Sequence, residues 1–151
     1  MSVGNVCNRE VVVADRADDL IEVAKLMRRY HVGSVIVVEH EGEAARPIGI
    51  ITDRDLVVEV LAEEVDCATV GLEDVMSPAP FTAREEDDLY DIIEVMRNKG
   101  VRRVPVVDDD GFLVGVLTVD DVLWNLSQEL GNIVSLIERQ PRAETGRQVQ
   151  L

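Results

Sequence analysis

The sequence predicts an α+β protein of two β-α-β-β-α repeats, packed as a pseudo-twofold pair with a cleft between the halves. The chain aligns with itself at an offset of 69, so that residues 5–38 match 74–107 with eleven identical pairs in 34 positions. In each copy, two fully apolar stretches follow a helical pattern, which is typical of buried strands. Because one unit of about 60 residues buries little apolar surface, we expect the two units to share a core.

The elements follow the same order in both copies. A short extended segment comes first, at 11–13 and at 81–82. Apolar residues at helical spacing then predict a helix, whose start carries paired aspartates that suit the positive end of the helix dipole. A second helix is expected to begin near Thr52 and Thr118, after the strands. The expected strands are 35–38, 48–51, 104–107 and 114–117.

The repeat also sets the expected boundaries. They are a first repeat at 1–65, a connector at 66–73, a second repeat at 74–128, and a C-terminal helix with a polar tail at 129–151. Residues 123–137 read as helical and carry an apolar stripe, which packs on the module, completes a dimer or receives a partner helix. The stripe consists of Leu126, Leu130, Ile133, Val134 and Ile137.

Composition excludes several classes of function. The 151 residues carry a net charge of −15, which repels nucleic acid and anionic membrane surfaces. No apolar run approaches the roughly 20 residues that span a bilayer, and no secretory signal is visible. We therefore expect a cytoplasmic protein without nucleic-acid or membrane partners. Two distant cysteines give no disulfide framework or zinc site.

One strand-to-helix corner occurs twice, as GIITDRD at 49–55 and GVLTVDD at 115–121. The carboxylates of Asp55 and Asp121 can each accept both hydrogens of a ribose diol. The hydroxyls of Thr52 and Thr118 can bind a ribose or phosphate oxygen at a helix N-terminus. The same T-x-x-D pattern is also a capping box, which needs no ligand. Duplication at facing corners favours a nucleotide site.

Each corner opens with a glycine, Gly49 or Gly115, which permits close approach of a backbone to a ligand. The apolar residues that follow each glycine are candidates to sandwich a flat base. They are Ile50, Ile51, Val116 and Leu117.

The duplicated unit, the two corners and the segment GVRRVPVVDDDG at 100–111 resemble the CBS domain in tandem, often called a Bateman module. The resemblance covers residues 5–127. It implies binding of an adenosine-containing ligand in the cleft, with AMP, ADP or ATP first and NAD or S-adenosylmethionine as further options. It also implies a homodimer and a regulatory role in energy sensing. The expected protein is a stand-alone module that signals by conformational change to an unidentified partner protein.

The resemblance adds further candidate ligand-binding residues. Arg102 and Arg103 stand where the family often has basic residues that contact phosphates, and Arg54 lies in the first corner. Copy one has Gly33 and Ser34 at the positions of Arg102 and Arg103, so the two halves are not equivalent. Two more candidates come from copy two. Thr82 lies beside the base by the family pattern, and Pro105 favours an edge or bulge that frees neighbouring carbonyls for a ligand.

The alternative is a ligand-free dimeric scaffold or interaction module, whose T-x-x-D corners are only helix caps. No catalytic constellation, metal-ligand set or phosphate-binding loop is found in the sequence. We therefore predict no enzyme activity, no metal and no required cofactor.

Overall fold

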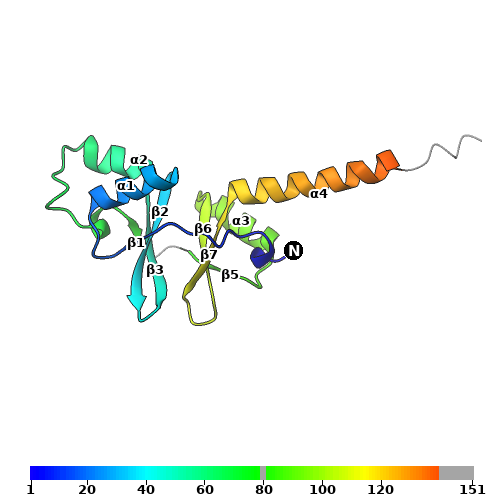
Figure 1. Cartoon of the computed structure of the whole chain (residues 1–151), viewed down its shortest axis with the longest axis horizontal. Coiled ribbons are helices and arrows are strands. Elements are labelled where there is room, and N and C mark those ends of the chain that lie inside the picture. The colour runs from blue at the N-terminus through cyan, green and yellow to red at the C-terminus, as the bar shows by residue number, and fades with distance from the viewer. Residues whose placement is uncertain (79–80, 140–151) are drawn as a thin grey trace, which may run out of the picture.

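In the computed structural model, which describes residues 1–78 and 81–139, two halves stand side by side and a long helix projects from the second half (Figure 1). Each half contains its own sheet, with helices packed against it. The first sheet has the order β1-β2-β3-β4 and the second has the order β5-β6-β7. The predicted fold class of two β-α-β-β-α repeats is confirmed.

The first half starts with β1 (Val13–Asp15), which runs parallel to β2 (Ser34–Glu41). Helix α1 (Leu20–Tyr30) connects these strands, and β3 (Ala44–Thr52) returns antiparallel to β2. A short helix, α2 (Asp53–Asp55), then continues into the π-helical segment η2 (Leu56–Leu61).

The second half repeats this order. Its elements are β5 (Ala83–Arg84), α3 (Leu89–Lys99), β6 (Arg103–Val107), β7 (Leu113–Thr118) and α4 (Val119–Arg139). The opening strands β1 and β5 begin two residues later than the sequence pattern predicts. Helix α4 is one continuous helix of 21 residues, and it includes the segment 123–137 that the sequence predicts as helical. The predicted polar tail beyond Arg139 lies outside the described residues.

The segment that leads into each repeat packs against the opposite half. Val3, in the 3-10 turn η1 (Val3–Asn5), is fully buried in the core of the second half. Asn8 exchanges two backbone hydrogen bonds with Val116 of β7, at 2.8 and 2.9 Å. The N-terminus accordingly lies beside the second half in Figure 1.

The lead segment of copy two is placed in the same way against the first half. Leu72, in the 3-10 turn η3 (Leu72–Asp74), is buried in the core of the first half, and β4 (Ser77–Pro78) pairs antiparallel with β3. The two lead segments therefore tie the halves together at equivalent points on their sheets.

Helices α1 and α3 begin and end in the same way in the two repeats. Asp19 caps α1 and Asp88 caps α3, and each accepts a backbone hydrogen bond from the first turn. Helix α1 ends at His31 and α3 ends at Gly100, both in the left-handed conformation with φ of 53° and 67°. No helix in the described part of the chain combines the length and apolarity that crossing a membrane requires.

Candidate functional site

A cleft of about 710 Å³ opens between the two halves, where the corners face each other. Both halves contribute to it, because its walls come from the end of β3, the start of α2, the lead of copy two and the start of β6. Its lining residues are Gly33, Ile50, Thr52, Asp53, Arg54, Ser77, Phe81, Gly100, Val101, Arg102, Arg103 and Asp120. The structure thus brings five sequence-predicted residues into one cleft, namely Ile50, Thr52, Arg54, Arg102 and Arg103.

The cleft concentrates positive charge in an acidic protein. It contains three arginines and two aspartates, Asp53 and Asp120, while the chain as a whole has a net charge of −15. Within residues 1–78 and 81–139, none of the three arginines forms a salt bridge. Guanidinium groups that lack a protein carboxylate partner are available to bind the oxygens of an anionic ligand.

Arg103 also links the two halves. Its guanidinium Nη1 donates a hydrogen bond to the hydroxyl of Ser34, which is the repeat-equivalent position in copy one. The pseudo-twofold relation therefore places Arg103 and Ser34 next to each other, and both are at least partly buried. A ligand phosphate in the cleft would compete with Ser34 for this guanidinium.

The two aspartates of the corners do not line the cleft; they cap helices. Asp55 accepts a hydrogen bond from the Thr52 backbone at 2.8 Å, and the Thr52 hydroxyl accepts one from the Asp55 backbone at 3.1 Å. Asp121 and Thr118 form the same reciprocal pair, with both bonds at 3.1 Å. The T-x-x-D pattern is therefore a capping box in both copies.

The two corners differ in how the threonine hydroxyl is used. Thr118 donates its hydroxyl hydrogen to Asp121 at 2.5 Å, whereas Thr52 donates its hydroxyl to no other described residue. Thr52 lines the cleft and Thr118 does not. Thr52 can therefore donate to a ligand oxygen without releasing its cap.

The two corner glycines are needed by the lead segments. A Cβ atom at Gly49 would lie 2.3 Å from Sδ of Met76, and a Cβ at Gly115 would lie 3.0 Å from the Asn8 carbonyl and 3.1 Å from Sγ of Cys7. Cys7 and Met76 are repeat-equivalent positions. The close approach predicted at these glycines is thus made by the protein chain, and neither glycine lines the cleft.

Neither Pro105 nor Thr82, both predicted as ligand-binding residues, lines the cleft. Pro105 is buried in β6, which is the central strand of its sheet and not an edge, but the strand has a register shift between Val106 and Val107, so an irregularity of the kind that the sequence suggested lies next to it. The strand tolerates it because β5 pairs only with Val106 and Val107, beside a register shift. In copy one, the equivalent Ile36 donates its N–H to the Val12 carbonyl at 3.2 Å. Proline has no N–H, so the corresponding bond to the Phe81 carbonyl cannot form.

Sequence reasoning missed Phe81, Ser77, Val101 and Asp53 as lining residues. Phe81, which follows the two undescribed residues 79–80 and precedes Thr82, is one of only two phenylalanines in the chain. Its rarity was the one available signal. Asp53 and Val101 lie within the quoted segments GIITDRD and GVRRVPVVDDDG, and Ser77 lies in the lead of copy two. None of the three was singled out, because the residues that line the cleft are set by how the halves pack together.

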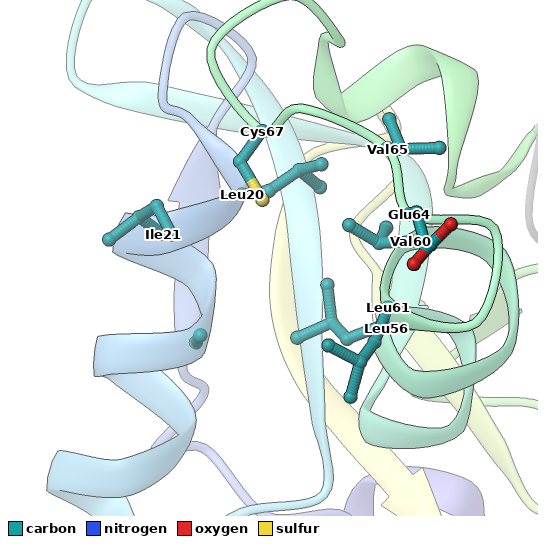
Figure 2. Close-up of a pocket in the computed structure, with 9 residues that line it drawn as sticks. Leu20, Ile21, Leu56, Val60, Leu61, Glu64, Val65 and Cys67 are labelled. Atoms are coloured by element: carbon teal, nitrogen blue, oxygen red, sulfur yellow. The ribbon is translucent and has the colours of Figure 1, made fainter.

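A second hollow, of about 460 Å³, lies between α1 and η2 (Figure 2). Its walls are mostly aliphatic, and Leu20, Leu56 and Val60 point into the space between the two helices. Glu64 and Cys67 lie at its border. This hollow contains none of the predicted site residues. In the described part of the chain, no group of three or more His, Cys, Asp or Glu side chains is placed to hold a metal ion.

The comparison with protein families agrees with the duplicated architecture. The model of the CBS domain family matches residues 3–62 and 72–128 of the chain. The chain belongs to the CBS domain family. The tandem CBS pair inferred from the two corners is thereby confirmed.

Relatives of the CBS pair are found in archaea and bacteria. The chain is 38% identical over 123 residues to an uncharacterised protein of Methanopyrus kandleri, covering 82% of this chain and 61% of that protein. It is 29% identical over 115 residues to inosine-5′-monophosphate dehydrogenase of Methanocaldococcus jannaschii, covering 76% of this chain and 21% of the enzyme. The chain therefore spans only part of these relatives' length.

Solved structures share the fold. The CBS domain pair of protein MJ0100, in complex with 5′-methylthioadenosine and S-adenosylmethionine, has a TM-score of 0.72 at 24% identity and covers 83% of this chain and 99% of its own. A CBS domain protein of Pyrobaculum aerophilum complexed with AMP has a TM-score of 0.72 at 24% identity, with coverage of 85% and 99%. A conserved protein of Pyrococcus horikoshii has a TM-score of 0.70 at 17% identity and covers 99% of this chain and 96% of its own, so the match extends through α4.

Proposed function

We propose that this CBS pair is a non-catalytic regulatory module that binds an adenosine nucleotide in the cleft between its halves. The observation that carries the proposal is the set of arginines without salt-bridge partners, Arg54, Arg102 and Arg103, gathered in one cleft of an acidic protein. Solved CBS pairs with the same fold hold AMP or S-adenosylmethionine, which supports an adenosine-containing ligand here. AMP, ADP and ATP fit the arginines better than a ligand without phosphate.

The cleft offers a place for each part of such a ligand. The ring of Phe81 and the side chain of Ile50 can contact the faces of a flat base. The Phe81 carbonyl, which Pro105 cannot bond, is an acceptor for the amino group of adenine. Arg54, Arg102 and the Thr52 hydroxyl can then bind phosphate oxygens near the helix start.

Ligand binding would be coupled to the arrangement of the halves. A phosphate that takes Arg103 from Ser34 changes a contact that links the two repeats. Such a change regulates a partner protein only if the ligand binds one arrangement more tightly than the other. The regulated protein and the homodimer implied by the family belong to this proposal. Exposed apolar residues lie on α1 and η2, including Ile21, Val57 and Leu61, and also along α4, so these helices are the candidate surfaces for pairing of two chains.

The test is a titration calorimetry series with adenosine, AMP, ADP, ATP, NAD and S-adenosylmethionine. We expect a nucleotide to bind the wild-type protein, and Arg102→Ala to weaken binding about 10- to 100-fold, because a hydrogen bond to a charged group contributes about 1.5–3 kcal/mol. Asp120→Asn should strengthen binding, because it removes a negative charge from the cleft. Arg97→Ala, at an exposed arginine of α3 outside the cleft, is the matched control.

The results separate the possible outcomes. Equal effects of Arg102→Ala and Arg97→Ala would refute a phosphate site in this cleft. If adenosine binds tightly and Arg102→Ala does not weaken its binding, the affinity comes from the base and the ribose alone. If the folded protein binds none of these compounds, the proposal is wrong.

A ligand-free scaffold is the second candidate, and the capping boxes favour it. Asp55 and Asp121 are already occupied by Thr52 and Thr118. If these residues are only caps, Asp55→Ala and Asp121→Ala lower the free energy of unfolding by about 1 kcal/mol each. A ligand-free scaffold also predicts that the wild-type protein binds no nucleotide in the calorimetry above, which is the result that distinguishes it from the first candidate.

A further inference from the structure

Helix α4 exposes an apolar face that the described residues, 1–78 and 81–139, leave uncovered. The helix leaves the second half after its first turn, where Val119 and Val122 pack into the core, and projects away from both halves (Figure 1). Beyond that turn its large apolar side chains are between 38% and 69% exposed. They are Leu123, Trp124, Leu126, Leu130, Ile133, Val134, Leu136 and Ile137.

Five of these residues form a regular seam along one side of the helix. Leu123, Leu126, Leu130, Ile133 and Ile137 follow one another at steps of three, four, three and four residues. This spacing is the a/d repeat of helices that pack side by side with a small left-handed twist. We call these five residues the α4 seam. A groove for an unrelated extended peptide or a small ligand would not require this period.

The charge distribution indicates what kind of helix covers the seam. The chain is 30% charged, yet Glu129 is the only charged residue from Val122 to Ile137. Two copies of a protein with a net charge of −15 repel each other over most of their surfaces. The projecting helix is where two copies can meet without opposing charges and with their acidic bodies held apart. From Val122 to Ile137 the helix also lacks the lysines and arginines with which amphipathic helices bind anionic lipid surfaces, and Arg139 at its end is its one basic residue.

The size of the seam fits a reversible dimer. The segment from Leu123 to Ile137 is about 22 Å long at 1.5 Å per residue, so pairing two such seams buries on the order of 1000 Å² in total. This is the lower end of the range for specific protein interfaces. We infer that α4 pairs with α4 of a second copy of this chain through the α4 seam, forming a concentration-dependent dimer. This inference is independent of nucleotide binding.

The experiment uses the full chain and two charge-matched variants. Leu130→Glu/Ile133→Glu adds two negative charges in the α4 seam. Gln128→Glu/Asn132→Glu adds the same charge on the opposite face, about 200° around the helix from Leu130. Analytical ultracentrifugation gives the dissociation constant, and hydrogen exchange measured at several protein concentrations shows which helix is covered.

We expect amides of residues 123–137 to exchange more slowly as the protein concentration rises. The seam variant should lose this protection and dimerise at least about 100-fold more weakly, because four buried apolar side chains become charged in the dimer. The opposite-face variant should behave as the wild type. Raising the NaCl concentration from about 0.05 to 0.5 M should strengthen the dimer, since salt screens the repulsion between acidic bodies.

Several results would overturn the inference. One is a rate of amide hydrogen exchange in residues 123–137 that does not depend on the protein concentration. This includes the case in which only α1 and η2 become protected as the concentration rises. Another is an unchanged dissociation constant in Leu130→Glu/Ile133→Glu, whose circular dichroism must match the wild type. A third is binding of α4 to vesicles of phosphatidylcholine and phosphatidylglycerol without self-association.

Discussion

The lead segment of copy two packs on β3 of the first half, and Gly49 lies at this contact. We therefore expect the fold to be sensitive to substitution of Gly49. A methyl group at residue 49 would lie 2.3 Å from Sδ and 2.7 Å from Cγ of Met76, where carbon contacts need about 3.5–4.0 Å. Met76 must therefore move by more than about 1 Å, and overpacking of this kind costs about 1–3 kcal/mol. Gly49 does not have a positive φ, so alanine also gains up to about 1 kcal/mol from reduced freedom of the unfolded chain. We expect Gly49→Ala to lower the free energy of unfolding by about 1–2 kcal/mol.

A double-mutant cycle tests whether Met76 is the cause. Met76→Ala removes Sδ and Cγ, the two closest atoms, but leaves the Met76 Cβ position at 3.1 Å, so Gly49→Ala in that background should cost clearly less than in the wild type. Urea unfolding followed by circular dichroism at a fixed protein concentration gives the four free energies. Gly131→Ala in α4, where a Cβ meets nothing within 4 Å, is a control that should be stabilising.

The cycle can refute the reasoning in two ways. An equal cost of Gly49→Ala with and without Met76 would show that the lead segment does not determine the need for glycine. A large loss of nucleotide binding in Gly49→Ala, with little change in stability, would instead show that this glycine belongs to the ligand site, as the sequence analysis predicts. Gly115→Ala should not be rescued by Cys7→Ala, because the Asn8 carbonyl remains 3.0 Å away.

Two further predictions concern the same packing. Leu72→Ala should lower the free energy of unfolding by about 2–5 kcal/mol and Val3→Ala by less, because each lead segment fills the core of the opposite half. Urea unfolding measures both changes, and values near zero would contradict this packing. Burial raises the pKa of the Cys7 thiol, so Cys7 should react with iodoacetamide more slowly at pH 8 than free cysteine. The folded state holds the Cys7 proton more tightly than the unfolded state does, so the stability that Cys7 contributes is present at lower pH and is lost as the pH rises through its folded pKa. Equal alkylation rates of Cys7 and free cysteine would contradict the raised pKa.

The sequence could predict the repeated unit because its signals are local or periodic. The offset of 69 residues, the aspartates at the helix starts and the apolar strands all act within one repeat. Their physical causes are capping, strand burial and helix amphipathicity, which need no knowledge of the partner half. The corners at Thr52 and Thr118 belong to this class, and both are capping boxes in the structure.

The cleft could be predicted only in part, because its lining depends on how the halves meet. Arg102 and Arg103 were found through the family resemblance, whereas Ser77 and Phe81 enter the cleft through the lead of copy two. The role of Gly49 could not be deduced, since nothing in the sequence shows that Met76 crosses over it. The helical pattern of residues 123–137 could be read from the sequence, and Gly131 does not break α4 because one glycine costs a helix only about 1 kcal/mol.

The two repeats have diverged where charge matters and have kept the residues that build the scaffold. The caps, the corner glycines and the buried lead residues are present in both copies. Gly33, Ser34 and Asp120 in turn occupy the positions equivalent to Arg102, Arg103 and Arg54. In the nucleotide complex proposed above, a twofold scaffold with one arginine-rich side would hold the phosphate off the axis, and the ligand would act unequally on the two halves. This asymmetry gives a chain with two similar repeats a physical route from ligand binding to a change in their relative arrangement.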